Sequence, residues 1–86
     1  MKMKFSHEES YIIFNFDIEK EKATIIENNA NDFLTIIFAD KKYNEIKNWL
    51  IARCGGNKTI EEAINLCRTN RGISMVDRIT IEIMTD

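Results

Sequence analysis

The 86-residue chain contains no proline and no glutamine, and only one histidine and three glycines. No apolar stretch is longer than four residues, whereas a helix that spans a bilayer needs about 20. The first ten residues include two lysines, but no apolar segment follows them, so a signal peptide is not predicted. These absences argue against a membrane or secreted protein, and we expect a cytoplasmic one.

Isoleucine, asparagine and lysine are abundant instead, with 15, 9 and 8 copies. This bias is typical of AT-rich genomes and fits a bacterial or phage source, and the β-branched isoleucines favour strands. Hydrophobic residues make up 44% and charged residues 30% of the chain, which is a composition that folds. The length predicts a single domain over residues 1–86, with a thin core that a deep substrate cavity would largely consume.

Apolar side chains predict strands in five segments. The clearest are residues 11–18 and 78–84, in which apolar residues on one face alternate with mostly polar residues on the other. Residues 22–28 follow the first of these after a charged turn, which favours an antiparallel hairpin. Residues 33–39 are a nearly continuous apolar run, which predicts a central strand. Residues 1–5 alternate methionine and phenylalanine with lysine, and they predict a short edge strand.

The apolar period changes after Asp40, which is predicted to cap a helix over residues 41–54. Gly55 supplies the left-handed residue that ends such a helix. Thr59 and Glu62 match a capping box, which predicts the start of a second helix. The residues predicted to face the core are Tyr43, Ile46, Leu50 and Cys54 in the first helix, and Ile60, Ala63, Ile64 and Cys67 in the second.

These elements together predict an α+β fold. We expect an antiparallel sheet of about four strands in the order β-β-β-α-α-β, with a helical hairpin packed on one face. The strand at residues 1–5 would precede this order, and the sequence does not fix the order of the strands within the sheet. The final strand is expected to have an exposed edge, which can pair with a second copy in a homodimer.

The candidate catalytic residues are few. His7 lies beside Glu8 and Glu9, but a lone histidine in a polar loop is more often solvated, and a closed metal site needs about four ligands. Cys54 and Cys67 fall on apolar helical stripes, so we expect buried free thiols rather than nucleophiles or a disulfide. The sequence therefore predicts no cofactor, no metal and no enzymatic activity.

Charge is distributed unevenly along the chain. Residues 7–32 contain seven acidic and two basic side chains, a net charge of −5, whereas residues 41–78 contain eight basic and four acidic ones, a net charge of +4. We predict that the acidic hairpin contacts a protein with a basic, nucleic-acid-binding groove, because complementary charge speeds encounter and selects the partner. The predicted contact residues are Asp17, Glu19, Glu21 and Glu27 in the hairpin, and Trp49 as an aromatic anchor.

Small acidic domains without catalytic motifs usually work by binding. By class analogy we expect an inhibitor from a phage or mobile element that blocks a host defence protein, as anti-CRISPR proteins do. The alternative is a small nucleic-acid-binding regulator that contacts phosphates through the basic helical pair, although a pI near 5.4 opposes this. Its predicted contacts are Lys41, Lys42, Lys47, Arg53, Lys58, Arg68 and Arg71. A third hypothesis is a small enzyme around His7, and the simplest interpretation is that the charges only keep the domain soluble.

Overall fold

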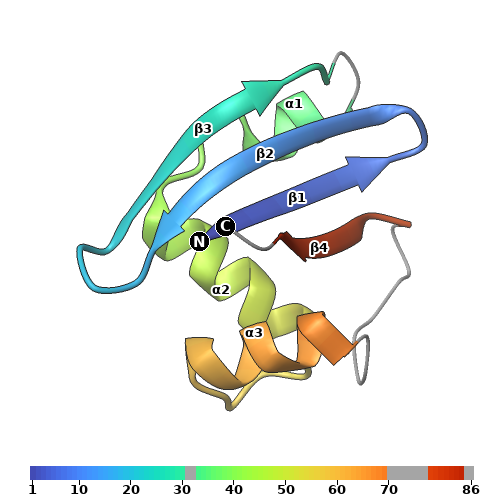
Figure 1. The fold of residues 1–86 in the computed structure, drawn as a ribbon. Coiled ribbons are helices and arrows are strands. Elements are labelled where there is room, and N and C mark those ends of the chain that lie inside the picture. Colours follow the sequence, from blue (N-terminus) through green and yellow to red (C-terminus); the bar gives the residue numbers. More distant parts are fainter. Residues whose placement is uncertain (31–32, 70–77, 85–86) are drawn as a thin grey trace.

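A computed structural model describes residues 1–30, 33–69 and 78–84 of the chain. The fold is α+β, as predicted, with helices α1 and α2 behind the sheet and α3 below it in the view of Figure 1. The strands are β1 (Lys2–His7), β2 (Ser10–Asp17), β3 (Lys22–Asn28) and β4 (Thr80–Met84). The helices are α1 (Phe33–Phe38), α2 (Tyr43–Arg53) and α3 (Ile60–Thr69).

The four strands form one antiparallel sheet in the order β3-β2-β1-β4. Side chains that lie opposite each other across the ladder share a face. Met3 faces Phe14 on one side and Ile83 on the other, so these three point toward the helices. Lys4 lies between Ile13 and Glu82 and points the opposite way, to the face that we call the open face. The alternation predicted for β2 and β4 is therefore confirmed.

Two of the strand predictions need correction. The segment predicted to be an edge strand is β1, which lies in the centre of the sheet between β2 and β4. The apolar run at residues 33–39, predicted to be a central strand, is instead the helix α1, so that prediction is wrong. Within α1, Leu34 and Phe38 lie four positions apart and are buried, whereas Ile36 is 86% exposed.

Both errors have one physical cause. Because the described helices cover only one face of the sheet, a central strand needs apolar side chains at every second position only. β1 satisfies this with Met3 and Phe5 inside and lysines outside. A continuous apolar run in a strand would expose half of its side chains on the open face, whereas a helix buries those at i and i+4 together.

The capping interactions position the two longer helices. α2 begins at Tyr43 rather than after Asp40, and the Lys42 amide donates to the Glu45 carboxylate at 3.3 Å, so the predicted Asp40 cap is wrong. Gly55 follows the helix with φ of 97°, as predicted, and its amide donates to the helix's last turn.

The predicted capping box of α3 is confirmed. The Thr59 amide donates to Glu62 Oε1 at 3.1 Å, and the Glu62 amide donates to Thr59 Oγ1 at 3.2 Å. The hydrogen bond that the Thr59 amide donates to the Glu62 carboxylate is the main reason that the pKa of this carboxyl lies below its ordinary value. All four residues predicted to form the apolar stripe of α3 are buried.

Aromatic rings fill the space between the sheet and the helices. The Phe5 ring stacks on Phe38 with centroids 4.6 Å apart, and it meets the Phe14 ring edge-on at 5.6 Å. Trp49 packs edge-on against Phe5 and Phe38 at 5.5 and 4.9 Å. This cluster joins β1 and β2 to α1 and α2, and it fixes the position of the helical layer beneath the sheet.

Candidate interaction surface on the β2–β3 hairpin

The hairpin formed by β2 and β3 reaches past the helical layer at the left of Figure 1. Asp17, Glu19 and Glu21 lie together at its turn, where the Asp17 carboxylate accepts a hydrogen bond from the Lys20 amide at 3.1 Å. Glu21 adopts a left-handed φ of 53°. The structure therefore brings together three of the four acidic residues that the sequence singled out.

Glu27 lies apart from these three. It lies six positions after Glu21 along β3, which corresponds to about 20 Å of extended chain. On the open face the Tyr11 hydroxyl donates to the Glu27 carboxylate, and the Lys4 ammonium lies 4.8 Å from the centroid of the Tyr11 ring. The hydrogen bond to Glu27 is the main reason that the pKa of Tyr11 is raised above its ordinary value.

β3 is the least buried strand of the sheet. Every residue except Ala23 is exposed, and its two isoleucines, Ile25 and Ile26, are 37% and 51% exposed. Ile13 pairs with Glu27 and Phe14 with Ile25, so Ile26 is an additional residue that forms a β-bulge in this edge strand. A bulge interrupts the regular ladder that another strand would extend. Sequence reasoning missed this exposed pair, although two isoleucines in succession beside a charged turn are visible in the sequence.

A cavity of about 340 Å³ lies between the start of β3 and the start of α2. Its lining residues are Glu21, Lys22, Ala23, Thr24, Lys42 and Tyr43. The Tyr43 side chain is only 6% exposed, and its ring stacks on Phe16 with centroids 4.7 Å apart. Burial raises the pKa of Tyr43 above its ordinary value, and the nearby carboxylates of Glu21, Glu61 and Asp17 raise it further.

The aromatic candidate from the sequence, Trp49, is only partly exposed. Besides its contacts with Phe5 and Phe38, it lies under the Arg53 guanidinium, 4.5 Å from the ring centroid. Arg53 is itself 9% exposed and donates to the Ile79 carbonyl at 2.8 Å. Trp49 and Arg53 thus join α2 to the start of β4, and this placement favours a structural role for both.

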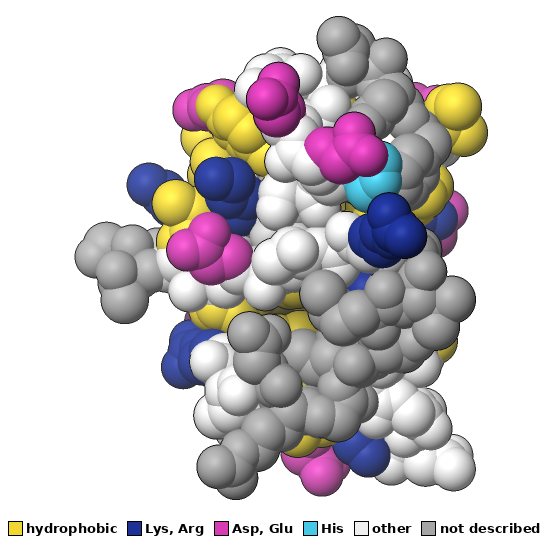
Figure 2. All heavy atoms as spheres, turned by 90° about the vertical axis from the view of Figure 1, so that its right-hand side faces the viewer, with side chains coloured by type: hydrophobic (Ala, Val, Ile, Leu, Met, Phe, Trp, Pro, Cys, Tyr) yellow, Lys and Arg dark blue, Asp and Glu magenta, His cyan; other side chains and the backbone are white. Residues whose placement is uncertain are grey.

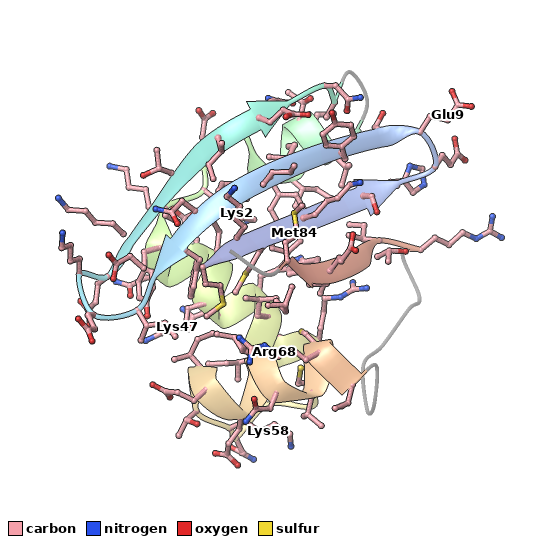
Figure 3. All side chains as sticks on the ribbon, in the orientation of Figure 1. Lys2, Glu9, Lys47, Lys58, Arg68 and Met84 are labelled. Carbon is pink, nitrogen blue, oxygen red and sulfur yellow. The ribbon has the colours of Figure 1, made fainter. Side chains whose placement is uncertain are left out.

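The remaining basic candidates are scattered. Lys47, Lys58 and Arg68 lie at separate places on the helical layer in Figure 3, and Lys41 and Lys42 precede α2. Arg71 lies outside the described residues. On the face shown in Figure 2, acidic and basic side chains are interspersed around the single histidine, His7, which is half-buried. The described cations therefore form no continuous stripe of the kind that follows a phosphate backbone.

The two cysteines are buried free thiols, as predicted. The Cys54 thiol donates to the Ala63 carbonyl at 3.7 Å. Burial, together with the neighbouring Cys54, raises the pKa of Cys67 to about 12. A thiol with such a pKa stays protonated at neutral pH, and the thiolate is the reactive form.

The described residues offer few sites of other kinds. In residues 1–30, 33–69 and 78–84, no three His, Cys, Asp or Glu side chains are grouped so that they could hold a metal ion. Among these residues there is also no helix long and apolar enough to cross a membrane.

β4 lies at the second edge of the sheet, as predicted, and its pairing with another copy stays a prediction. No protein-family model, curated protein or solved structure matches the chain.

Proposed function

We propose that the chain is a non-enzymatic protein-binding module that recognises its partner through the β2–β3 hairpin. The observation that carries this proposal is the exposure of β3, where Ile25 and Ile26 are accessible on a strand that also leads to the acidic turn. Exposed apolar side chains rimmed by charge are typical of protein-binding surfaces. Because the bulge at Ile26 interrupts the edge, the proposed contacts are made by side chains rather than by an added strand.

The chemistry of the hairpin favours a basic partner. Carboxylates at both ends of β3 flank the exposed isoleucines, and they would complement a groove lined by lysine and arginine, such as one that binds nucleic acid. By class analogy, the chain would act as a small inhibitor of the kind that phages and mobile elements direct against host defence proteins. Occupation of a nucleic-acid-binding groove by the hairpin would then block the host protein by competition.

The test is a pull-down from host lysate with the tagged chain, with and without nuclease. The charge-reversed variant Glu19→Lys/Glu21→Lys is compared with wild type, and captured proteins are quantified by mass spectrometry. The chain offers a matched control in Glu8→Lys/Glu9→Lys. This control changes the net charge equally, lies in the other hairpin turn, and likewise includes one glutamate with positive φ, because φ is 56° at Glu8 and 53° at Glu21.

The proposal predicts a nuclease-resistant protein partner that is captured at least about tenfold less by the β2–β3 variant and normally by the control. Equal capture by both variants would remove the hairpin from the recognition surface. Recovery of nucleic acid, with all protein partners lost after nuclease, would replace the proposal with the nucleic-acid-binding regulator.

A further inference from the structure

The two edges of the sheet differ in regularity. Among the described strands, β4 pairs with β1 alone and lies at the lower edge of the sheet in Figure 1. Its pairing runs from Thr80 to Met84 without a shift of register, whereas β3 at the opposite edge contains the bulge at Ile26. The five residues of β4 include no lysine and no proline, which commonly protect an edge strand. β4 is therefore the edge that suits pairing with a further strand.

The backbone groups of β4 alternate between β1 and the outer edge. Met1 and Phe16 exchange both of their hydrogen bonds, at 3.3 and 2.7 Å, so Met1 points to β2. In an antiparallel ladder every second residue points the same way, and the residues between them point to the other neighbour. Lys4 therefore points to β4, where it lies opposite Glu82. Because Glu82 points back to β1, the amide and carbonyl of the next residue, Ile81, point to the outer edge.

The side chains of β4 are incompletely covered within one copy of the chain. Ile81 faces the helical layer and is buried, but Ile83 on the same face is only partly buried. Thr80 and Glu82 are exposed on the open face. A strand added beside β4 would therefore cover apolar surface at Ile83 as well as pair the outward backbone groups.

We infer that β4 pairs with β4 of a second copy of the chain, antiparallel, about a two-fold axis between the two Ile81 residues. The two Ile81 residues then exchange both backbone hydrogen bonds. Thr80 lies opposite Glu82 of the second copy on the open face, and Ile83 lies opposite Ile79 of the second copy on the core face. The two sheets become one, and the β2–β3 hairpin of each copy stays at an outer edge, so the inference does not depend on the proposed function.

Charge and hydrogen bonding select this register. A two-fold axis at Glu82 would place the two Glu82 carboxylates directly opposite each other, which is destabilising. An axis at Thr80 would use the carbonyl of Ile79, which already accepts a hydrogen bond from Arg53 at 2.8 Å. A shift by one residue would place core-facing side chains opposite open-face ones. The proposed register instead pairs apolar with apolar and polar with polar residues, so the strand is complementary to itself, as a two-fold interface requires.

The test measures the oligomeric state of the full chain by sedimentation equilibrium over a wide range of protein concentrations. Wild type should form dimers. Thr80→Glu places a carboxylate opposite each Glu82 of the other copy and should weaken dimerisation by about fivefold or more, whereas Thr80→Lys places an ammonium there and should strengthen it. Thr24→Glu is the matched control, because Thr24 is also exposed and lies opposite Asn15 in the edge strand β3. This control should dimerise as wild type does.

Amide hydrogen exchange of the ¹⁵N-labelled chain gives a second measurement. Protection of the Ile81 amide should rise with protein concentration in wild type and rise less in Thr80→Glu. A chain that stays monomeric at every concentration, exchange at Ile81 that does not depend on concentration, or equal dimerisation of wild type and Thr80→Glu would each overturn the inference. Weaker dimerisation in both Thr80→Glu and Thr80→Lys would overturn the register, because it would indicate that the two Thr80 residues lie opposite each other.

Discussion

Removal of the Phe5 side chain should destabilise the domain more than any change on its surface. Phe5 is fully buried on the central strand β1, and its ring contacts those of Phe14, Phe38 and Trp49 at centroid distances of 4.6 to 5.6 Å. Replacement of a buried phenylalanine by alanine costs about 3–5 kcal/mol through lost burial and the cavity left behind. A domain of 86 residues has a total stability of about 4–13 kcal/mol. Phe5→Ala should therefore remove a large share of the free energy of unfolding.

The assay is urea unfolding followed by the fluorescence of Trp49, the only tryptophan of the chain, which packs directly against Phe5. With a slope of about 1 kcal/mol/M, the midpoint should fall by about 3–5 M. If Phe5→Ala is unfolded without urea, Phe5→Leu should still give a measurable loss of about 1–2 kcal/mol.

Ile36→Ala is the control, because Ile36 is 86% exposed on α1 and its truncation should change stability by less than about 0.5 kcal/mol. A loss below about 1 kcal/mol in Phe5→Ala, or an equal loss in the control, would refute the central position of β1 and the packing of the aromatic cluster.

Three further predictions follow from single contacts. Thr59→Ala removes the N-cap of α3 and should lower the free energy of unfolding by about 1 kcal/mol, measured by urea denaturation; no change would contradict the capping box. The hydrogen bond to Glu27 raises the pKa of Tyr11, so Tyr11 should ionise at higher pH than a free tyrosine when followed by ultraviolet absorbance. Glu27→Gln should return the pKa of Tyr11 toward its ordinary value. Because both thiols are buried, and the pKa of Cys67 is also raised to about 12, both should react slowly with a disulfide reagent at pH 8 and rapidly in urea. Fast labelling of the native protein would disprove their burial.

The local signals in the sequence were sufficient for several elements of the fold. Thr59 and Glu62 satisfy each other's backbone amides within one turn, so their capping box is readable without any tertiary context. Gly55 likewise ends α2 because its backbone conformation suits glycine. The strand alternation at β2 and the apolar stripe of α3 were also readable, since each repeats with the period of its own backbone.

The candidate site was only partly readable. The acidic residues at the hairpin turn follow one another closely in sequence, so their proximity could be predicted. The cavity between β3 and α2 could not be predicted, because Glu21 and Tyr43 are separated by 21 residues in the chain. They line the same cavity only when α2 packs beneath β3. The burial of Trp49 and Arg53 depends in the same way on contacts with β1, α1 and the start of β4.

The sequence by itself determined the fold class, the C-terminal end of α2 at Gly55 and the N-terminal cap of α3 at Thr59. It also determined the core-facing positions of β2 and α3. Only the tertiary structure decided that the segment 33–38 is helical, that β1 lies in the centre of the sheet, and that β3 is left exposed at its edge. The physical reason is that local signals report backbone geometry, whereas burial depends on which faces of the sheet the helices cover. A short apolar run suits either a strand or a helix until that coverage is known.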